Sequence, residues 1–221
     1  MADRRNRTRE VVILAAAYEL ADRGYYGTSY GRIAARAGVK RGLVQHYLRS
    51  KADIARTVAQ RAFQDGVFMA QAAAGPQLRG VEAILRFTVG VASRFLHSPY
   101  ARASARILEE LAHDDIGLPT PFIGWMRRIE ANIREAIKDG ELPDSVDPVE
   151  LAWLLVAAFH GVKSVTESLL DLDAFARRAG TIVAQLLAAH GARDAMATLA
   201  TVRRSRERTD NGKAANQPGW H

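Results

Sequence analysis

The chain has 221 residues and no cysteine, which excludes disulfide scaffolds, cysteine-based zinc sites and thiol nucleophiles. Hydrophobic residues make up 48% and charged residues 25% of the chain, a globular balance that excludes wholesale disorder and supplies enough apolar material for a core. The formal net charge of +7 indicates a polyanionic partner only where the charge is concentrated.

The positive charge is concentrated at the N-terminus. Residues 1–60 hold 12 Lys and Arg against 5 Asp and Glu, whereas residues 61–192 hold 13 against 16. Residues 193–221 add 6 against 3. This distribution predicts a small nucleic-acid-binding head on a larger, slightly acidic body that has another task.

Membrane and secretory signals are weak in this chain. The longest apolar run, around Leu151–Phe159, has about half of the roughly 20 residues that a spanning helix requires. The arginine-rich N-terminus before an apolar stretch superficially resembles a signal peptide, but the charged residues Glu19, Asp22 and Arg23 follow without a break. We therefore expect a cytoplasmic protein.

Helical periodicity extends over nearly the whole N-terminal quarter. The first helix is expected to end at Gly24, with an unpacked basic arm of four arginines ahead of it (Arg4, Arg5, Arg7 and Arg9). Thr28 is the expected N-cap of a short helix that ends near Arg36, and Gly38 then permits a tight turn. A second short helix over Lys40–Leu48 and a long helix from Lys51 to about Ala73, capped by Ser50, are expected to follow.

The body is also predicted to be helical, and no strand-like alternation is sustained anywhere in the chain. Three later helix starts share a capping residue followed by proline, and the predicted body helices cover residues 81–97, 99–113, 121–139, 148–169 and 173–190. The fold class is therefore all-α. We expect a DNA-binding domain over residues 1–52, a ligand-binding and dimerisation domain over residues 53–192, and a flexible basic tail over residues 193–221.

Residues 28–48 carry the most specific pattern, that of a helix-turn-helix. Ile33, Ala34, Val39 and Val44 can face the interior, while the second helix presents polar side chains that suit a major groove, Lys40, Arg41, Gln45 and Tyr47. Lys51, at the start of the next helix, can meet a phosphate. The alternative is a helical hairpin with a solvated basic face.

Residues 9–55 resemble the N-terminal DNA-binding domain of TetR-family transcriptional repressors. The resemblance is carried by Ile33-Ala34-x-x-Ala37-Gly38-Val39, Gly42 and Lys51. The recognition helix departs from the family pattern, because Gln45 replaces the usual phosphate-contacting tyrosine and Lys40 replaces the usual Ser or Thr cap. The DNA-binding residues expected on this basis are Arg4, Arg5, Thr28, Lys40, Arg41, Gln45, Tyr47 and Lys51.

The body contains many aromatic and aliphatic residues, which include Phe95, Ile107, Ile129 and Trp153, and by default we interpret them as core. The segment Pro119-x-Pro121-Phe122-x-x-Trp125 resembles the γ-butyrolactone-type autoregulator receptors, a branch of the same family in which the tryptophan lines a ligand pocket. The resemblance implies a pocket that includes Phe87, Val91, Phe122, Trp125, Phe159, Val162 and Lys163.

The expected ligand differs from that of the branch, because Val162 stands where a ligand-binding threonine is expected. An aromatic wall without that hydroxyl favours a different signal, such as a butenolide or a furan carboxylic acid, whose carboxylate could pair with Lys163 or His160. Alternatively, Lys163 is solvated and His160 is a hydrogen-bonded core or interface residue. No cofactor is expected.

The last two body helices carry broad apolar faces, and in the family such helices pair across a two-fold axis. A two-fold dimer presents two identical heads to a palindromic operator. We therefore expect a homodimer with three kinds of contact: a double-stranded DNA operator, a small-molecule signalling ligand and its own second copy.

The chain has no Gly-rich phosphate loop, no nucleophile elbow and no His-Glu-x-x-His pair, so we expect no enzyme. The best metal-like cluster contains Glu109, His113, Asp114 and Asp115, and a solvated helix end explains it better than a metal.

These patterns together predict a homodimeric repressor that a small autoregulator releases from its operator, with control of antibiotic or secondary-metabolite genes. Two alternatives stay open. One is a TetR-type regulator of efflux genes with a broad drug pocket, and the other is a ligand-independent DNA-binding interaction protein.

Overall fold

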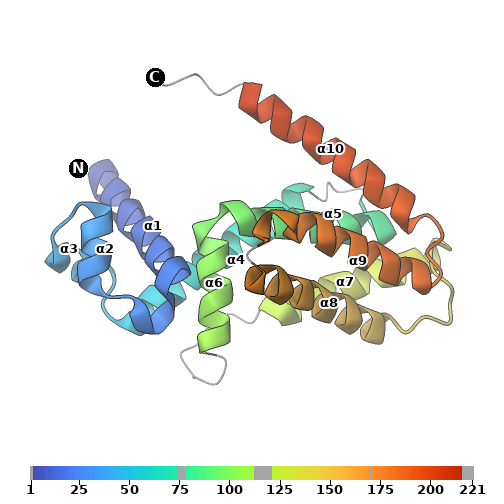
Figure 1. Ribbon diagram of the computed structural model, residues 1–221, viewed down its shortest axis with the longest axis horizontal. Helices are drawn as coiled ribbons and strands as arrows, with labels where there is room; N and C mark the ends of the chain where they lie inside the picture. The colour runs from blue at the N-terminus through green and yellow to red at the C-terminus, as the bar shows by residue number, and fades with distance from the viewer. Residues whose placement is uncertain (1, 74–77, 112–120, 170, 216–221) are drawn as a thin grey trace. The chain divides into compact units, whose positions relative to one another are not determined.

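The computed structural model describes the backbone of residues 2–73, 78–111, 121–169 and 171–215, and these residues form α-helices and one short 3-10 helix without any strand (Figure 1). The helices are α1 (Ala2–Gly27), α2 (Tyr30–Ala37), α3 (Arg41–Tyr47), α4 (Lys51–Ala73), α5 (Gly80–His97), α6 (Pro99–Glu110), α7 (Pro121–Lys138), α8 (Pro148–Ser168), η1 (Leu172–Ala174), α9 (Phe175–Ala189) and α10 (Ala195–Ala215). The predicted all-α class is confirmed.

The chain divides into two compact units, and the division differs from the expected domain boundaries. One unit contains residues 1–69 and 94–121, and the other contains residues 70–93 and 122–221. The N-terminal unit is therefore larger than the predicted head, because the chain returns to it through α6, which packs along α1. The expected division at residue 52 placed α6 in the body.

The core of the N-terminal unit is built from one face of each of its helices. Ile33, Ala34 and Val44 are buried as predicted, and Val39 packs partly against them. The same cluster contains a series of buried residues of α1, α4 and α6: Val12, Ala15, Ala16, Ala17, Leu20, Ile54, Ala55, Val58, Ala103 and Ile107. These side chains hold α1 and the two short helices α2 and α3 in one arrangement.

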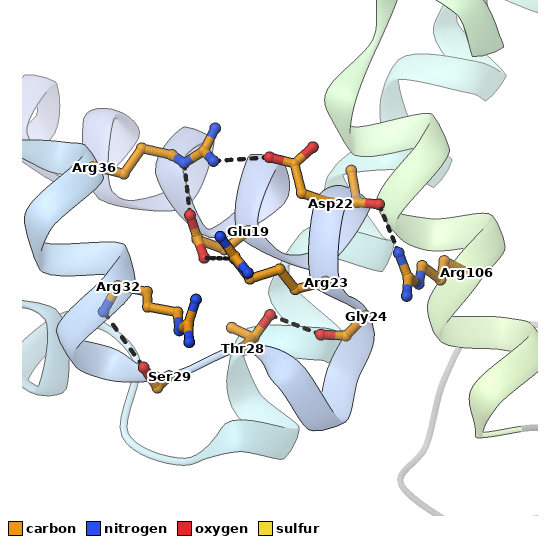
Figure 2. A network of polar contacts seen from close by, with 10 residues as sticks. Glu19, Asp22, Arg23, Gly24, Thr28, Ser29, Arg32, Arg36 and Arg106 are labelled. Carbon is orange, nitrogen blue, oxygen red and sulfur yellow. Dashed lines mark hydrogen bonds and ion pairs between the residues drawn. The ribbon is translucent and has the colours of Figure 1, made fainter.

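Two local predictions for this unit are wrong. The N-cap of α2 is Ser29, whose hydroxyl accepts the N–H of Arg32 at 3.4 Å, rather than Thr28 (Figure 2). Thr28 is buried and its hydroxyl donates to the carbonyl of Gly24 at 2.7 Å. The expected unpacked arm is also helical, since α1 begins at Ala2 and residues with good helix propensity extend it beyond the packed part.

A charged network joins α1 to α2 (Figure 2). Glu19 is buried, and one of its carboxylate oxygens accepts a hydrogen bond from Nε of Arg36 at 2.8 Å. Arg36 also donates to Asp22 at 2.8 Å, and Arg23 lies 3.5 Å from the second oxygen of Glu19. The pKa of Arg36 is raised, chiefly by the hydrogen bond to Glu19. Arg36 is therefore used within the head, where it compensates a buried carboxylate.

The core of the second unit lies between α5, α7, α8, α9 and the start of α10. Large buried side chains from these helices include Ile84, Leu85, Ile133, Leu151, Leu155, Leu187 and Leu199. The start of the predicted flexible tail is packed, because Ala195, Leu199 and Val202 of α10 are buried in this core. Three apolar residues with spacings of four and three bury one face of an otherwise polar helix.

Helix α8 carries apolar side chains that the unit leaves uncovered. Trp153 is 61% exposed, so its predicted place in the bundle interior is wrong. Val149, Val165 and Leu169 are exposed at 52%, 57% and 67%. Val149 and Trp153 lie one turn apart near the start of α8, whereas Val165 and Leu169 lie one turn apart at its end. Within the described residues, α8 alone is long and apolar enough to cross a membrane by length and composition, and 39% of that stretch is buried in the unit.

Replacement of Gly38 by Ala should lower the free energy of unfolding by about 1–2 kcal/mol, because Gly38 ends α2 in the left-handed region at φ 65° and ψ 31°. A Cβ there would meet nothing within 4 Å, so the expected cost is conformational only. Urea unfolding followed by circular dichroism measures it.

The matched control is Gly31→Ala, within α2, where a Cβ also meets nothing within 4 Å. Because alanine is the better helix former, this variant should be more stable than the wild type by about 0.5–1 kcal/mol. Equal effects of the two substitutions would contradict the assigned turn.

Candidate functional site

The turn between α2 and α3 gives the head its helix-turn-helix geometry. Gly38 adopts a positive φ, and its backbone N–H reaches the carbonyls of Ala34 and Ala35 at the end of α2. The N–H of Val39 also bonds to the carbonyl of Ala34 at 3.0 Å. These bonds satisfy the end of α2 and redirect the chain into α3, so α3 can project from the head.

The outer face of α3 is polar and unobstructed. Arg41, Gln45 and His46 are exposed, and Val44 is buried against the core on the opposite side. Lys40 is the exposed N-cap of α3 and makes no side-chain cap bond, as its replacement of Ser or Thr predicts. Within two helical turns this face offers the ammonium of Lys40, the guanidinium of Arg41 and the amide of Gln45. Such donors can bind the edges of guanine and adenine.

The last turn of α3 lies against the beginning of α1. The hydroxyl of Tyr47 donates to the carbonyl of Arg5 at 3.4 Å, and the side chain of Arg5 is exposed. Arg61 of α4 forms a salt bridge of 3.3 Å with Glu10 of α1, so α4 also contacts the first turns of α1. The structure therefore brings the predicted residues Tyr47 and Arg5 together. The side chain of Arg4 lies outside the described residues.

Lys51 is held at a defined place at the start of α4. Its Nζ donates to the carbonyl of Tyr26 at 2.9 Å and lies 5.0 Å from the centroid of the Tyr25 ring. Ser50 accepts the N–H of Asp53 at 3.0 Å, so the predicted cap of α4 is confirmed. The two tyrosines are absent from the predicted site, and only the break at Gly24 directly before them is a sequence signal for this place.

Thr28 differs from the other predicted DNA-binding residues. Thr28 is only 3% exposed and its hydroxyl is used within the head, whereas Lys40, Arg41 and Gln45 are exposed. A role for Thr28 at the DNA stays a prediction.

In the second unit, the predicted pocket residues Phe87, Trp125 and Phe159 come together as an aromatic cluster. The Trp125 ring lies edge-on to Phe87 at 5.9 Å and to Phe159 at 5.8 Å, measured between centroids. Phe159 in turn lies 5.2 Å from the buried Phe175, a residue that the sequence analysis did not select. Four aromatic rings from α5, α7, α8 and α9 thus meet in one place.

Charged and polar groups lie close to this cluster along the same helices. The guanidinium of Arg128 lies 5.6 Å from the Phe87 centroid, which is within cation–π distance. Lys163 is 5% exposed, and its Nζ pairs with Glu167 at 2.8 Å. Lys163 is therefore a buried, paired cation, contrary to the solvated alternative.

The remaining predicted pocket residues are divided. Val162 is buried next to Lys163, and Val91 and His160 are half-buried. The side chain of Phe122 lies outside the described residues. The hydroxyl of Thr166, one turn after Val162 and 1% exposed, donates to the Val162 carbonyl at 2.8 Å.

A surface groove of about 740 Å³ lies elsewhere in this unit, between the loop before α8, the first turns of α8 and the end of α9. Its walls include Pro143, Asp147, Glu150, Trp153 and His190. This groove is distinct from the aromatic cluster and shares Trp153 with the exposed apolar face of α8.

Among the described residues, no group of three His, Asp or Glu side chains could hold a metal ion. Glu109 is exposed at the end of α6, and the other three members of the metal-like cluster, His113, Asp114 and Asp115, lie outside the described residues.

Comparison with known proteins supports the resemblance to bacterial transcriptional regulators. A curated relative, the A-factor receptor protein of Streptomyces griseus, is 26% identical over 157 residues, which cover 71% of this chain. The match covers 54% of that protein, so the chain spans about half the length of this relative.

Two solved structures resemble the fold closely. One, described as the molecular basis for control of antibiotic production by bacterial hormones, is 28% identical with a TM-score of 0.73, over 81% of this chain and 95% of the other. A γ-butyrolactone receptor, an ArpA-like protein, is 25% identical with a TM-score of 0.63, over 83% of this chain and 98% of the other.

Two family profiles match separate parts of the chain. Residues 12–58 match the profile of bacterial regulatory proteins of the tetR family, and residues 78–189 match the tetracyclin repressor-like C-terminal domain. The first match covers α2 and α3 with their flanking helices, and the second covers the aromatic cluster and alone extends over half of the chain. The chain therefore belongs to the TetR family of bacterial regulatory proteins, as its sequence resemblance predicts.

Proposed function

We propose that this TetR-family protein is a homodimeric transcriptional repressor that binds a palindromic operator and is released by a small autoregulator of the γ-butyrolactone, butenolide or furan type. In this role it controls antibiotic or other secondary-metabolite genes. The observation that carries the proposal is the exposed polar face of α3, with Lys40, Arg41 and Gln45 projecting from a packed helix-turn-helix.

The DNA-binding part rests on charge and geometry together. Residues 1–60 hold a net charge of +7, and Lys40 and Arg41 are exposed at the start of α3 while Val44 is buried in the core. A helix with one buried and one exposed cationic face can enter a major groove while its own core stays intact. Lys51 and Arg5 supply backbone contacts, and Gln45 supplies readout of an adenine edge. Residues 1–52 are the DNA-binding domain in this proposal.

The ligand-binding part rests on the aromatic cluster and on likeness to receptors of signalling lactones. Trp125 offers an apolar ring face and one N–H donor, which suit an alkyl chain and a ring carbonyl. Lys163 is buried beside Val162 and already pairs with Glu167 at 2.8 Å, so a ligand carboxylate would compete with Glu167 for it. A lactone or butenolide carbonyl needs no such exchange. Residues 53–192 are the ligand-binding and dimerisation domain in this proposal.

The homodimer rests on the uncovered apolar face of α8. A large tryptophan and three aliphatic side chains exposed along α8 are costly to leave in water, and a second copy can cover them through an isologous contact. Two heads related by a two-fold axis then read the two halves of a palindrome.

This proposal makes the chain a regulator without enzymatic activity that acts in the cytoplasm, where its operator is. A second candidate function is the regulation of efflux genes through a broad drug pocket, for which the rings of Phe87 and Trp125 beside Arg128 would form a wall. Release of the DNA by many unrelated compounds would distinguish this function from the first. Regulation without any small ligand is the third, and it requires DNA binding that no compound changes.

Gln45→Ala tests the readout of bases by α3. Duplexes are first selected by the wild-type protein from a random-sequence library, and failure to enrich any duplex would overturn the proposed function. Loss of an amide that pairs with an adenine edge should weaken the selected duplex by about 1–3 kcal/mol. Binding to mixed-sequence DNA should change little, because no charge is lost. Fluorescence anisotropy titrations measure both, and Gln60→Ala, an exposed glutamine on α4, is the control.

Trp125→Phe tests the ligand site. This change keeps an aromatic ring against Phe87 and Phe159 but removes the indole N–H and part of the ring surface. Affinity for the γ-butyrolactone or furan carboxylic acid that releases the wild-type protein from DNA should fall about tenfold or more, as loss of one buried hydrogen bond predicts. Isothermal titration calorimetry measures it. Trp153→Phe makes the same change on the exposed face of α8, and equal affinities for wild type and Trp125→Phe would remove Trp125 from the site.

Trp153→Glu tests the dimer face. A charge in the centre of an apolar contact should raise the dimer dissociation constant about thirtyfold or more, since a central tryptophan contributes about 2 kcal/mol or more to such interfaces. Because Trp153 is 61% exposed in one copy, the fold of the monomer should persist. Sedimentation velocity over a concentration series measures the constant. Arg127→Glu on the exposed side of α7 is the control, and an unchanged dimer would contradict the assigned face.

A further inference from the structure

The end of α1 is bent by Gly24, and a carboxylate of α6 occupies the space that this glycine leaves. Gly24 has φ 70° and ψ −176°, so the helix is interrupted there. A Cβ at Gly24 would overlap the side-chain carboxylate of Glu110. The N–H of Tyr25, directly after the bend, donates to Oε2 of Glu110 at 2.6 Å. A charged acceptor at this distance makes a strong hydrogen bond.

A second side chain of α6 holds the chain just before the bend. Nη1 of Arg106 donates to the carbonyl of Ala21 at 3.2 Å (Figure 2), and its Nε donates to Oε1 of Glu110 at 3.0 Å. Arg106 and Glu110 lie one helical turn apart, so both point from the same face of α6. Together they bind the backbone of α1 on both sides of Gly24. We call this arrangement the α6 clamp.

The residues after the bend in turn hold Lys51. The carbonyl of Tyr26 accepts a hydrogen bond from Nζ of Lys51 at 2.9 Å, and the rings of Tyr25 and Tyr26 lie 5.0 Å and 6.0 Å from that nitrogen. The position of the ammonium therefore depends on where the α6 clamp places Tyr25 and Tyr26. All of these contacts lie within the N-terminal unit.

We infer that Glu110 and Arg106 of α6 are positioning residues for DNA binding, because they set the place of the Lys51 ammonium through the bend at Gly24. The inference rests on the proposed DNA-binding function, in which Lys51 contacts a phosphate. An ammonium has three N–H donors, so two remain for phosphate oxygens after the bond to Tyr26. The clamp fixes the direction in which they point, which lowers the cost of ordering a long flexible side chain when DNA binds.

A double-mutant cycle between Glu110→Ala and Lys51→Met tests the inference. Affinity is measured for the duplex selected by the wild-type protein and for a mixed-sequence duplex of the same length, over a series of salt concentrations. Lys51→Met should weaken both duplexes about tenfold and lower the salt dependence, since one phosphate contact per subunit is lost. Glu110→Ala should have a similar effect, and the double variant should bind no more weakly than Lys51→Met.

The sign of the effect separates positioning from charge. Removal of a carboxylate raises the net charge by one, which by itself tightens binding to DNA. Glu130→Ala makes the same change in the other unit, where Glu130 pairs with Arg134 at 2.8 Å, and it should bind DNA as tightly as the wild type or slightly more tightly. Loss of affinity in Glu110→Ala alone would therefore follow from the position of Lys51.

Three results would overturn the inference. Glu110→Ala could bind as tightly as the wild type, or its effect could multiply with that of Lys51→Met, as a general loss of fold predicts. If the wild-type protein binds no duplex, the proposed function fails and the inference fails with it. Where Glu110→Ala does not fold, Glu110→Gln runs the same cycle, because its amide oxygen can still accept from Tyr25 and the expected loss is smaller.

Discussion

The packing of α1 on more than one side is the constraint on which the N-terminal unit depends. Val12, Ala15, Ala16 and Ala17 are all buried, and three consecutive buried residues cover more than half of the circumference of a helix. Helices α2 and α3 lie on one side of α1, and α6 lies on another. The small alanine side chains allow this close approach. Any change that displaces α1 therefore changes the recognition helix and α6 together.

The charged contacts of the unit are arranged around the same helix. Glu19 is buried on α1 and needs Arg36 of α2, and the backbone of α1 at Gly24 needs Glu110 and Arg106 of α6. Breaking one partner of a buried pair is costly because it leaves a charge or an N–H without compensation. The polar network thus specifies one arrangement of helices whose apolar faces alone would permit several.

The second unit divides its apolar residues between two tasks. Leucines and isoleucines of α5, α7, α8 and α9 form a continuous core, and four aromatic rings meet at one place within these helices. The opposite face of α8 keeps Trp153 and its aliphatic neighbours at the surface. A helix that is apolar on nearly all sides can serve both a core and an interface, and this explains why a sequence pattern placed Trp153 inside.

Helix positions and the helix-turn-helix were determined by the sequence itself, because capping residues, Pro at first positions and the Gly38 turn act over only a few residues. The exposed face of α3 was also predictable, since Gln45 points about 100° around this short helix from the apolar Val44. The tertiary structure alone decided that α6 belongs with α1, that α10 packs as a helix and that Glu110 reaches Tyr25. These contacts join residues far apart in the chain, 85 positions in the case of Tyr25 and Glu110. Local periodicity reports only on residues a few positions apart, so it cannot predict such contacts.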